Sequence, residues 1–265
     1  MIGRRVSTRM WLGLGVFTLA GRTAAAQPAA PALPPAPAAQ GGEGGEAGGE
    51  GGIDPARAET DPVEFLIAMD VIAAHFAAGL DIYRDGDATA AGEMFAHPIA
   101  EVYSDLEEVL ARLGVTPFRE EMESASTLAL DSAPLAEVEQ AVAAVRTALQ
   151  AAEAHAPPPG AIPKVQALVI ADMADRAAAQ YEVALREPGQ LEPYLDGYGF
   201  TRAAALRAGR LGPELRAANL GPVLEAIEAM LAALAPAYPS ASRPAAPADA
   251  APVLAAAERL RQALN

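Results

Sequence analysis

The chain of 265 residues contains no cysteine and only three histidines. The lack of cysteine excludes disulfides, thiolate metal sites, iron–sulfur clusters and cysteine nucleophiles. Runs of β-branched residues, which favour strands, are also missing, whereas alanine is abundant. The fold must therefore be stabilised by packing alone, and the composition favours helices over strands.

Positive charge is scarce as well. The chain has 19 Lys and Arg residues against 34 Asp and Glu residues, which gives a formal net charge of −15. Such an acidic surface is repelled by phosphate backbones and by anionic lipid headgroups, so nucleic acid and membrane surfaces are unfavourable partners. A cationic partner or a metal ion is the natural counterpart of this charge.

The sequence also lacks the common catalytic motifs. It has no Gly-x-Ser-x-Gly elbow, no phosphate-binding glycine loop and no His-Glu-x-x-His zinc helix. None of its many carboxylates has an obvious partner that would adjust its pKa for acid–base chemistry. We therefore expect that the protein is not an enzyme.

Residues 1–26 have the pattern of a secretory signal peptide. A basic stretch that ends at Arg9 precedes an apolar stretch over residues 10–20, and Ala24 and Ala26 supply the small residues of a cleavage site. The alternative, a membrane-spanning helix, needs about 20 apolar residues and this stretch has far fewer. We expect a cleaved signal, a periplasmic protein and no membrane anchor.

The export route follows from the basic region. The pair Arg4-Arg5 raises the twin-arginine route. Ser7, however, stands where that signal usually carries a large apolar residue, so we expect the general secretory route instead. Cleavage would remove four arginines and no acidic residue, which takes the formal net charge from −15 to −19.

Two tracts of biased composition flank the rest of the chain. Residues 27–58 are rich first in Ala and Pro and then in Gly and Glu, which predicts a disordered linker. Residues 236–252, rich in Pro and Ala, predict a second linker before a short helix at 253–265. The region between them, 59–235, is predicted to be a helical domain. A subdivision near 156–160 is possible, so one core or two remain open.

The first predicted helix shows the clearest pattern. Asp61 is a helix cap, Pro62 fits the first helical position, and Glu64 is the acid of a capping box. An apolar stripe at spacings of three and four then runs along one face. Its members are Phe65, Met69, Ile72, Phe76, Leu80 and Tyr83.

A second helix is predicted at 88–113, with a kink at Pro98 because the proline ring displaces the carbonyl of Met94. Short connections between neighbouring helices imply antiparallel packing. We therefore predict an all-α fold, an antiparallel helical bundle or a stack of helical hairpins. The remaining helices are expected at about 117–130, 134–154, 162–187, 193–209 and 213–235.

Two of the three histidines belong to this first predicted hairpin. His75 and His97 are equally far from its turn near Gly86, so we expect them to lie level across the interface. A helical wheel places His75 at the boundary of the apolar stripe. Glu101 lies one turn after His97 on the same face. Two imidazoles with a carboxylate make a candidate site for iron, copper or zinc.

Several alternatives accompany this metal site. Met94 and Asp70 are weaker candidate ligands, and Met94 is equally well explained as core filler. Two boundary histidines that bond to nearby acids would give the same pattern without a metal. His155, which precedes a run of prolines, is predicted to be a solvated residue near a helix end.

A second cluster of aromatic and acidic residues lies around a predicted helix–helix turn. The density of rings suggests a pocket or contact surface. The alternative is that the rings seal a corner of the bundle. The candidate residues are Tyr181, Glu182, Tyr194, Asp196 and Tyr198.

Three short segments carry a resemblance to a family. They are Ala179-Gln-Tyr181-Glu-Val-Ala184, Glu192-Pro-Tyr194-Leu-Asp196-Gly-Tyr-Gly-Phe200 and His97-Pro98-Ile-Ala-Glu101-Val-Tyr103. The first two resemble the extracytoplasmic helical domain of high-affinity iron permeases and its stand-alone relatives. The third is similar to a motif in exported helical proteins. This resemblance implies a periplasmic component associated with metal uptake.

The leading hypothesis is a soluble periplasmic helical protein that binds or escorts a transition metal, with iron favoured, as an accessory to uptake. Its partner would be a membrane permease or another periplasmic protein. The alternative is a cofactor-free helical scaffold or protein-interaction module.

Overall fold

The computed structural model describes residues 52–159 and 162–265. The predicted signal peptide and nearly all of the predicted first linker lie outside these residues. The described residues form helices and connecting segments without a strand, which confirms the all-α prediction. The helices are α1 (Pro55–Ala58), α2 (Pro62–Arg84), α3 (Ala88–Pro98), a π-helical turn η1 (Ile99–Tyr103), α4 (Ser104–Arg112), α5 (Arg119–Leu130), α6 (Leu135–Glu153), α7 (Pro163–Arg186), α8 (Glu192–Ala217), α9 (Gly221–Leu234) and α10 (Ala251–Leu264).

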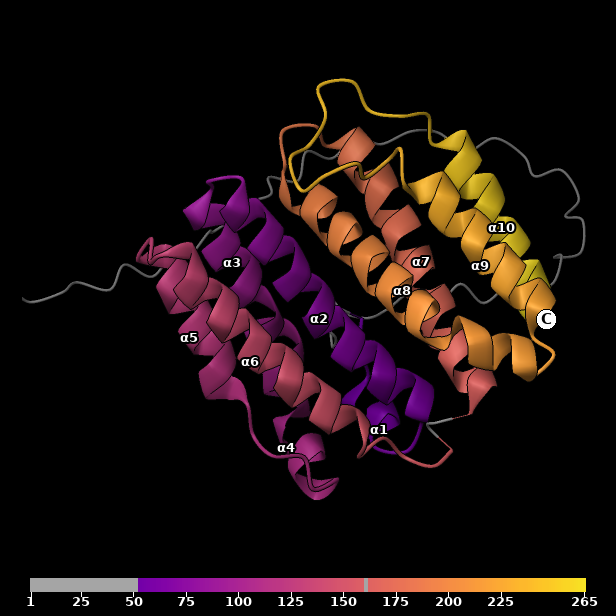
Figure 1. Cartoon of the computed structure of the whole chain (residues 1–265), viewed down its shortest axis with the longest axis horizontal. Coiled ribbons are helices and arrows are strands. Elements are labelled where there is room, and N and C mark those ends of the chain that lie inside the picture. The colour runs from indigo at the N-terminus through magenta and orange to yellow at the C-terminus, as the bar shows by residue number, and fades with distance from the viewer. Residues whose placement is uncertain (1–51, 160–161) are drawn as a thin grey trace, which may run out of the picture. The chain divides into compact units, whose positions relative to one another are not determined.

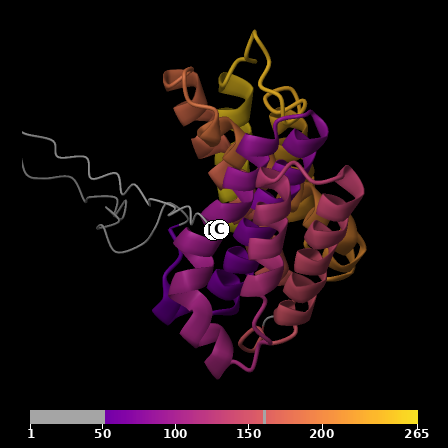
Figure 2. The same ribbon diagram turned by 90° about the vertical axis from the view of Figure 1, so that its left-hand side faces the viewer.

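Helix α2 lies at the centre of the packing (Figure 1). It contacts α3, α6, α7 and α8. Helix α5 contacts α3 and α6. Figure 2 views the molecule from the side on which α3, α5 and α6 lie. On the other side α7 packs against α8. Helix α9 packs on both of these helices, and α10 packs on α7 and α9.

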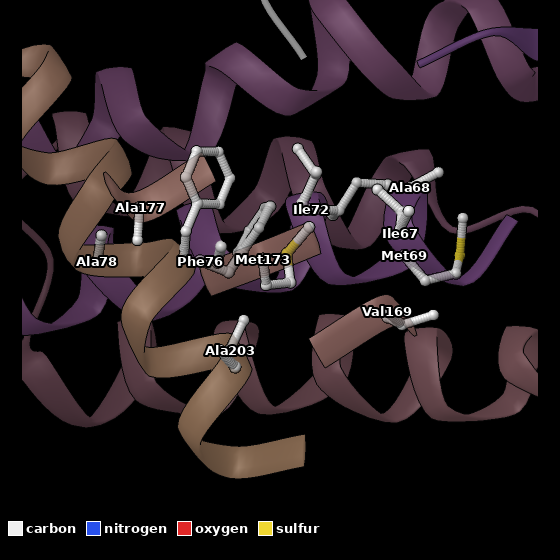
Figure 3. Close-up of a cluster of buried hydrophobic side chains, with 14 of the residues drawn as sticks. Ile67, Ala68, Met69, Ile72, Phe76, Ala78, Val169, Met173, Ala177 and Ala203 are labelled. Carbon is white, nitrogen blue, oxygen red and sulfur yellow. The ribbon is translucent and has the colours of Figure 1, made fainter. Parts of the chain in front are cut away.

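The described residues share one hydrophobic core, so no subdivision near 156–160 is found. Figure 3 shows part of this core, to which α2 contributes Phe76, α7 contributes Met173 and Ala177, and α8 contributes Ala203. Of the 23 residues of α2, 16 are buried, and they occupy all of its faces. The predicted stripe is therefore correct for Phe65 to Phe76, but α2 has no polar face opposite it.

The length and composition of α2 would allow it to cross a membrane. Its most apolar window is 78% buried by the rest of the fold. Among the described residues it is the one helix with these properties, and its burial is that of a core helix.

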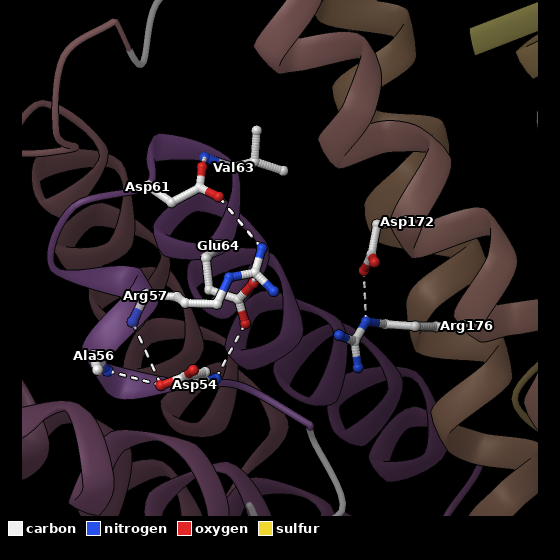
Figure 4. A network of polar contacts seen from close by, with 8 residues as sticks. All are labelled: Asp54, Ala56, Arg57, Asp61, Val63, Glu64, Asp172 and Arg176. Carbon is white, nitrogen blue, oxygen red and sulfur yellow. Dashed lines mark hydrogen bonds and ion pairs between the residues drawn. The ribbon is translucent and has the colours of Figure 1, made fainter. Parts of the chain in front are cut away.

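The start of α2 is capped differently from the prediction. Asp61 accepts a hydrogen bond from the Val63 amide, as an N-cap residue does. Glu64 does not return to Asp61, because the Asp61 amide already donates to the Arg57 carbonyl. Glu64 instead accepts from the Asp54 amide at 3.1 Å and pairs with Arg57 at 3.3 Å (Figure 4). These contacts hold α1 against α2, so the predicted linker 27–58 is wrong for residues 55–58, which are helical.

Pro98 produces a π-helical turn within the predicted second helix. It has no N–H to donate to the Met94 carbonyl, so the regular hydrogen-bond ladder cannot continue through it. The Ile99 carbonyl accepts instead from the amide of Ser104, five residues later, and also from the Ser104 hydroxyl at 2.6 Å. The predicted kink is thus realised as one wider turn.

The predicted break between residues 209 and 213 is wrong. Helix α8 continues through Pro213 and ends at Ala217. The chain reverses only at Asn219, whose φ of 61° lies in the left-handed region that asparagine tolerates after a helix end.

The segment 236–252 is irregular, as predicted, but it is not a free linker. Tyr238 and Ala241 are buried, and the Tyr238 hydroxyl donates to the Ala177 carbonyl at 2.8 Å. Arg243 donates to carbonyl oxygens of Ala184 and Pro188. The segment therefore packs on α7, and α10 belongs to the same core.

Two glycines of α8 allow close packing. A Cβ atom on Gly199 would lie 2.5 Å from the carbonyl oxygen of Ala74, so α8 approaches the backbone of α2 directly. Gly197 similarly leaves room for the hydroxyl of Tyr238. The Gly-Tyr-Gly step thus places one face of α8 against α2 and a neighbouring position against the 236–252 segment.

We predict that Gly199→Ala lowers the free energy of unfolding by about 1–3 kcal/mol, because the added methyl group must push α8 away from α2. Gly209→Ala is the matched control, since it lies in the same helix and a Cβ there meets nothing within 4 Å. Alanine should raise stability at this position by about 0.5–1 kcal/mol. Urea unfolding of both variants measures the difference, and equal effects would contradict the packing described.

Candidate metal centre

His75 is buried in α2, with 5% of its surface exposed, so its predicted boundary position is wrong. Its Nδ1 lies 2.8 Å from the Val71 carbonyl oxygen. Because a carbonyl only accepts, Nδ1 carries the hydrogen and Nε2 carries the lone pair in the neutral ring. Burial and, to a lesser degree, the neighbouring His97 lower the pKa of His75 to about 4. His75 is therefore neutral at pH 7, the form that binds metals.

His97, at the end of α3, lies beside His75 as predicted. The two ring centroids are 6.5 Å apart and the rings are nearly perpendicular. The His97 side chain is 29% exposed, so it lies between the buried His75 and solvent. His75 is thus the inner, buried imidazole of the pair, and His97 is the outer, partly exposed one.

Helix α8 adds two carboxylates that the first candidate set did not include. Asp196 Oδ1 lies 3.4 Å from His75 Nε2, and Glu192 Oε1 lies 3.3 Å from His97 Nδ1. The two acids are one turn apart on α8 and so lie on the same helical face. The close approach at Gly199 brings this face to the histidines.

Glu101, in the π-helical turn, completes the outer position. Donor atoms of His97, Glu101 and Glu192 all lie within 4.8 Å of one another. Two ligands on opposite sides of one ion are at most about 4.4 Å apart with bonds of about 2.2 Å. The Glu192 side chain is 44% exposed and can make the small adjustment that this requires. The donor set of one imidazole and two carboxylates fits a divalent transition metal.

The weaker candidate ligands lie elsewhere. Asp70 is bound on both carboxylate oxygens by the buried Arg207, at 2.5 and 2.6 Å. Arg207 also binds Gln166 and Glu153, which links α2, α6, α7 and α8. Met94 is 2% exposed and belongs to the hydrophobic core. The structure therefore gives Asp70 and Met94 structural roles.

The second predicted cluster separates into different parts. Tyr181 and Tyr194 donate to the carbonyls of Ala248 and Ser240, both at 2.7 Å, and so hold the 236–252 segment. Tyr198 donates to Asp81 Oδ2 at 2.8 Å, and burial raises the pKa of its hydroxyl to about 12. These rings seal the packing, which was the alternative interpretation. Asp196 is the one member that joins the histidines.

Two other predicted positions are at the surface. Glu182 is exposed and takes no part in the hydrogen bonds of Tyr181, Tyr194 and Tyr198. His155 is exposed, as predicted, and its Nδ1 lies 3.0 Å from the Leu113 carbonyl at the end of α4.

Glu192 was missed as a ligand, although the sequence holds a signal for it. Glu192 and Asp196 are spaced by four residues at the start of a predicted helix, and the two glycines that follow indicate close helix packing. What the spacing cannot indicate is which helix α8 approaches.

Comparisons of the chain with protein-family models, with curated proteins and with solved structures give no match in any of the three. The assignment of this site therefore depends on its own geometry and chemistry.

We predict that metal-free protein loses stability in mild acid through His75. The unfolded chain takes up a proton on this residue below about pH 6.5, whereas the folded protein does so only near pH 4. The free energy of unfolding should thus fall by about 2–3 kcal/mol between pH 7.5 and 4.5 from this group alone. Urea unfolding of chelator-treated protein at the two pH values measures the loss.

The comparison variants are His75→Gln and His155→Gln. The first should show a smaller loss between the two pH values, because it removes the buried titrating group; His97 and Asp196, which face it, remain. The second replaces an exposed histidine and should keep the full loss. An unchanged loss in His75→Gln would show that other groups cause the acid sensitivity.

We predict that Arg207→Leu lowers the free energy of unfolding by about 3–5 kcal/mol, because it leaves the buried Asp70 carboxylate without its counter-charge. The double variant Arg207→Leu/Asp70→Asn should recover part of this loss. Chemical unfolding measures both, and a double variant less stable than the single one would contradict the assignment of Asp70 to this ion pair.

Proposed function

We propose that the protein binds a transition-metal ion, with iron favoured, through His97, Glu101 and Glu192. The observation that carries this proposal is the convergence of one imidazole nitrogen and two carboxylates from separate helices within 4.8 Å. The side chains come from the end of α3, from the π-helical turn and from the first turn of α8. π-Helical turns often occur at functional sites, and this one carries Glu101.

His75 and Asp196, which are buried beside the triad of His97, Glu101 and Glu192, support the same proposal. The lone pair of His75 Nε2 faces a carboxylate oxygen at 3.4 Å, so two acceptors oppose each other in a buried place. An imidazole nitrogen and a carboxylate oxygen are both ligand atoms for a divalent transition metal. The bond from Nδ1 to the Val71 carbonyl fixes the ring in the orientation that metal-bound histidines commonly have.

The donor set favours iron over copper. Copper(I) sites commonly use thiolate or thioether sulfur, but the chain has no cysteine and Met94 is part of the core. Histidine combined with carboxylates is typical of non-haem iron sites, and the same ligand atoms also bind zinc. Iron is preferred to zinc here because carboxylates outnumber imidazoles at the outer position.

The proposed role is that of an exported metal carrier that serves as an accessory to uptake. Two features support it: the signal-like residues 1–26, and the resemblance of the His97–Tyr103 and Glu192–Phe200 segments to exported helical proteins and iron-permease domains, respectively. The outer ligands are partly exposed, so an ion can enter and leave without unfolding the protein. The expected partner is a membrane permease or another periplasmic protein.

A cofactor-free scaffold is the second candidate, and one observation favours it. His97 Nδ1 and Glu192 Oε1 lie at ion-pair distance, 3.3 Å apart. Under this alternative the contact only stabilises the packing of α8 beside α2 and α3.

We predict that untagged, chelator-treated protein binds one equivalent of Fe²⁺ in anaerobic calorimetry. His97→Ala or Glu192→Gln should weaken binding at least about tenfold, because each removes one ligand of the outer position. Titrations with Zn²⁺ and Cu²⁺ under the same conditions rank the metals. Tighter binding of either ion than of Fe²⁺ would contradict the preference for iron.

Two surface variants serve as controls. His155→Ala and Glu182→Gln remove the same chemical groups from exposed positions outside the site and should bind Fe²⁺ as the unchanged protein does. If the unchanged protein and all four variants contain negligible metal and bind none, the carrier proposal fails and the scaffold is favoured.

A further inference from the structure

A second site lies farther along α8 than the candidate metal centre, between Arg202 and Arg210. Two adjoining cavities of about 350 and 190 Å³ share the lining residues Ala73, Arg146, Leu149 and Leu206. They therefore form one continuous groove, which we call the α6/α8 groove. Its floor is α2, and its walls are α6 and α8, which flank α2 in Figure 1.

The surface of this groove is mainly apolar. Met69, Phe76 and Leu149 line its interior, and Leu206 stands on the wall formed by α8. Leu206 is 64% exposed, the largest exposed fraction among the large hydrophobic residues of the described chain. An apolar group bound in the groove would remove this leucine from water, which is favourable.

The charged residues of the groove are mostly arginines. Four of them are already paired with carboxylates: Arg207 with Asp70 and Glu153, Arg210 with Glu153, Arg202 with Asp81, and Arg84 with Asp81 and Glu139. Arg146 differs, because it makes no ion pair or hydrogen bond with any residue that the structure describes. It projects from α6 at the junction of the two cavities.

We propose that the α6/α8 groove binds a small organic anion, a carboxylate with an apolar alkyl or aryl body. Arg146 would bind the carboxylate, and the apolar body would lie against Leu149 and Leu206. The combination of an apolar wall with one available cation is what a small-molecule site needs for affinity and for orientation. In a chain with a net charge of −15, this arginine-lined groove is a local region of opposite sign.

The groove shares no residue with the candidate metal centre, although both use α2 and α8. Its α8 residues lie between Arg202 and Arg210, whereas Glu192 and Asp196 lie in the first turn and a half of that helix. Failure of metal binding would leave this proposal unaffected, and the reverse also holds.

The test uses octanoate and 2-naphthoate as probes, with octyltrimethylammonium as the cation of matched chain. We expect calorimetry to show saturable binding of at least one carboxylate and none of the cation. Arg146→Gln should weaken carboxylate binding about tenfold, because it removes a charge-assisted hydrogen bond. Leu206→Asp should weaken it similarly by placing a negative charge on the apolar wall.

Matched controls distinguish the groove from general surface effects. Arg259→Gln and Leu254→Asp make the same changes at exposed positions of α10 and should bind as the unchanged protein does. All four changes are at exposed side chains, so circular dichroism should show retained helicity. The proposal is overturned if neither carboxylate binds, if the cation binds equally well, or if Arg146→Gln and Arg259→Gln bind alike.

Discussion

The burial of most of α2, 16 of its 23 residues, is the constraint on which the other features of the structure depend. A surface helix can direct its polar side chains into water, but α2 is covered by α3, α6, α7 and α8. Each buried polar group on it must therefore find a partner inside the protein. Asp70 finds Arg207, His75 finds the Val71 carbonyl, and these requirements fix what surrounds the helix.

Helix α8 meets most of these requirements. Its Tyr198 binds Asp81 near the C-terminal end of α2, and its Arg207 binds Asp70 in the first half of α2, so the register of the two helices is fixed between these two points. Between these points Gly199 removes the side chain that would keep the backbones apart. As a consequence, Asp196 lies beside His75. The candidate metal centre is thus a product of the same packing that buries α2.

Much of the fold could be predicted from local patterns. The cap at Asp61 and the disturbance at Pro98 are encoded within a few residues, and the structure has both. The position of His75 could not be predicted in this way. The faces of α2 outside the predicted stripe include small residues such as Ala74 and Ala78, and alanine occurs on buried and exposed surfaces alike. A helical wheel therefore predicts that His75 lies at the boundary between a buried and an exposed face, but this part of α2 is buried on both sides of that boundary.

The contact between the histidine pair and Asp196, which belonged to two separate predicted clusters, shows a second limit of prediction from the sequence. His75 and His97 are related by a hairpin, and their proximity follows from distance along the chain to a turn. Asp196 is more than a hundred residues from His75, and no local pattern states which helix α8 will contact. The Gly-Tyr-Gly step after Asp196 indicates a close approach without identifying its partner. Only the three-dimensional arrangement joins these residues.

The balance of charge around α2 and α8 explains why the two proposed sites take ligands of opposite sign. In the interior, Arg207 is neutralised by acids and His75 stays uncharged. The balance changes at the two edges of this interface. At one edge, two carboxylates accompany the single imidazole of His97, which favours a cation. At the other edge, Arg146 stands over an apolar wall, and the ligand that satisfies both is an organic anion.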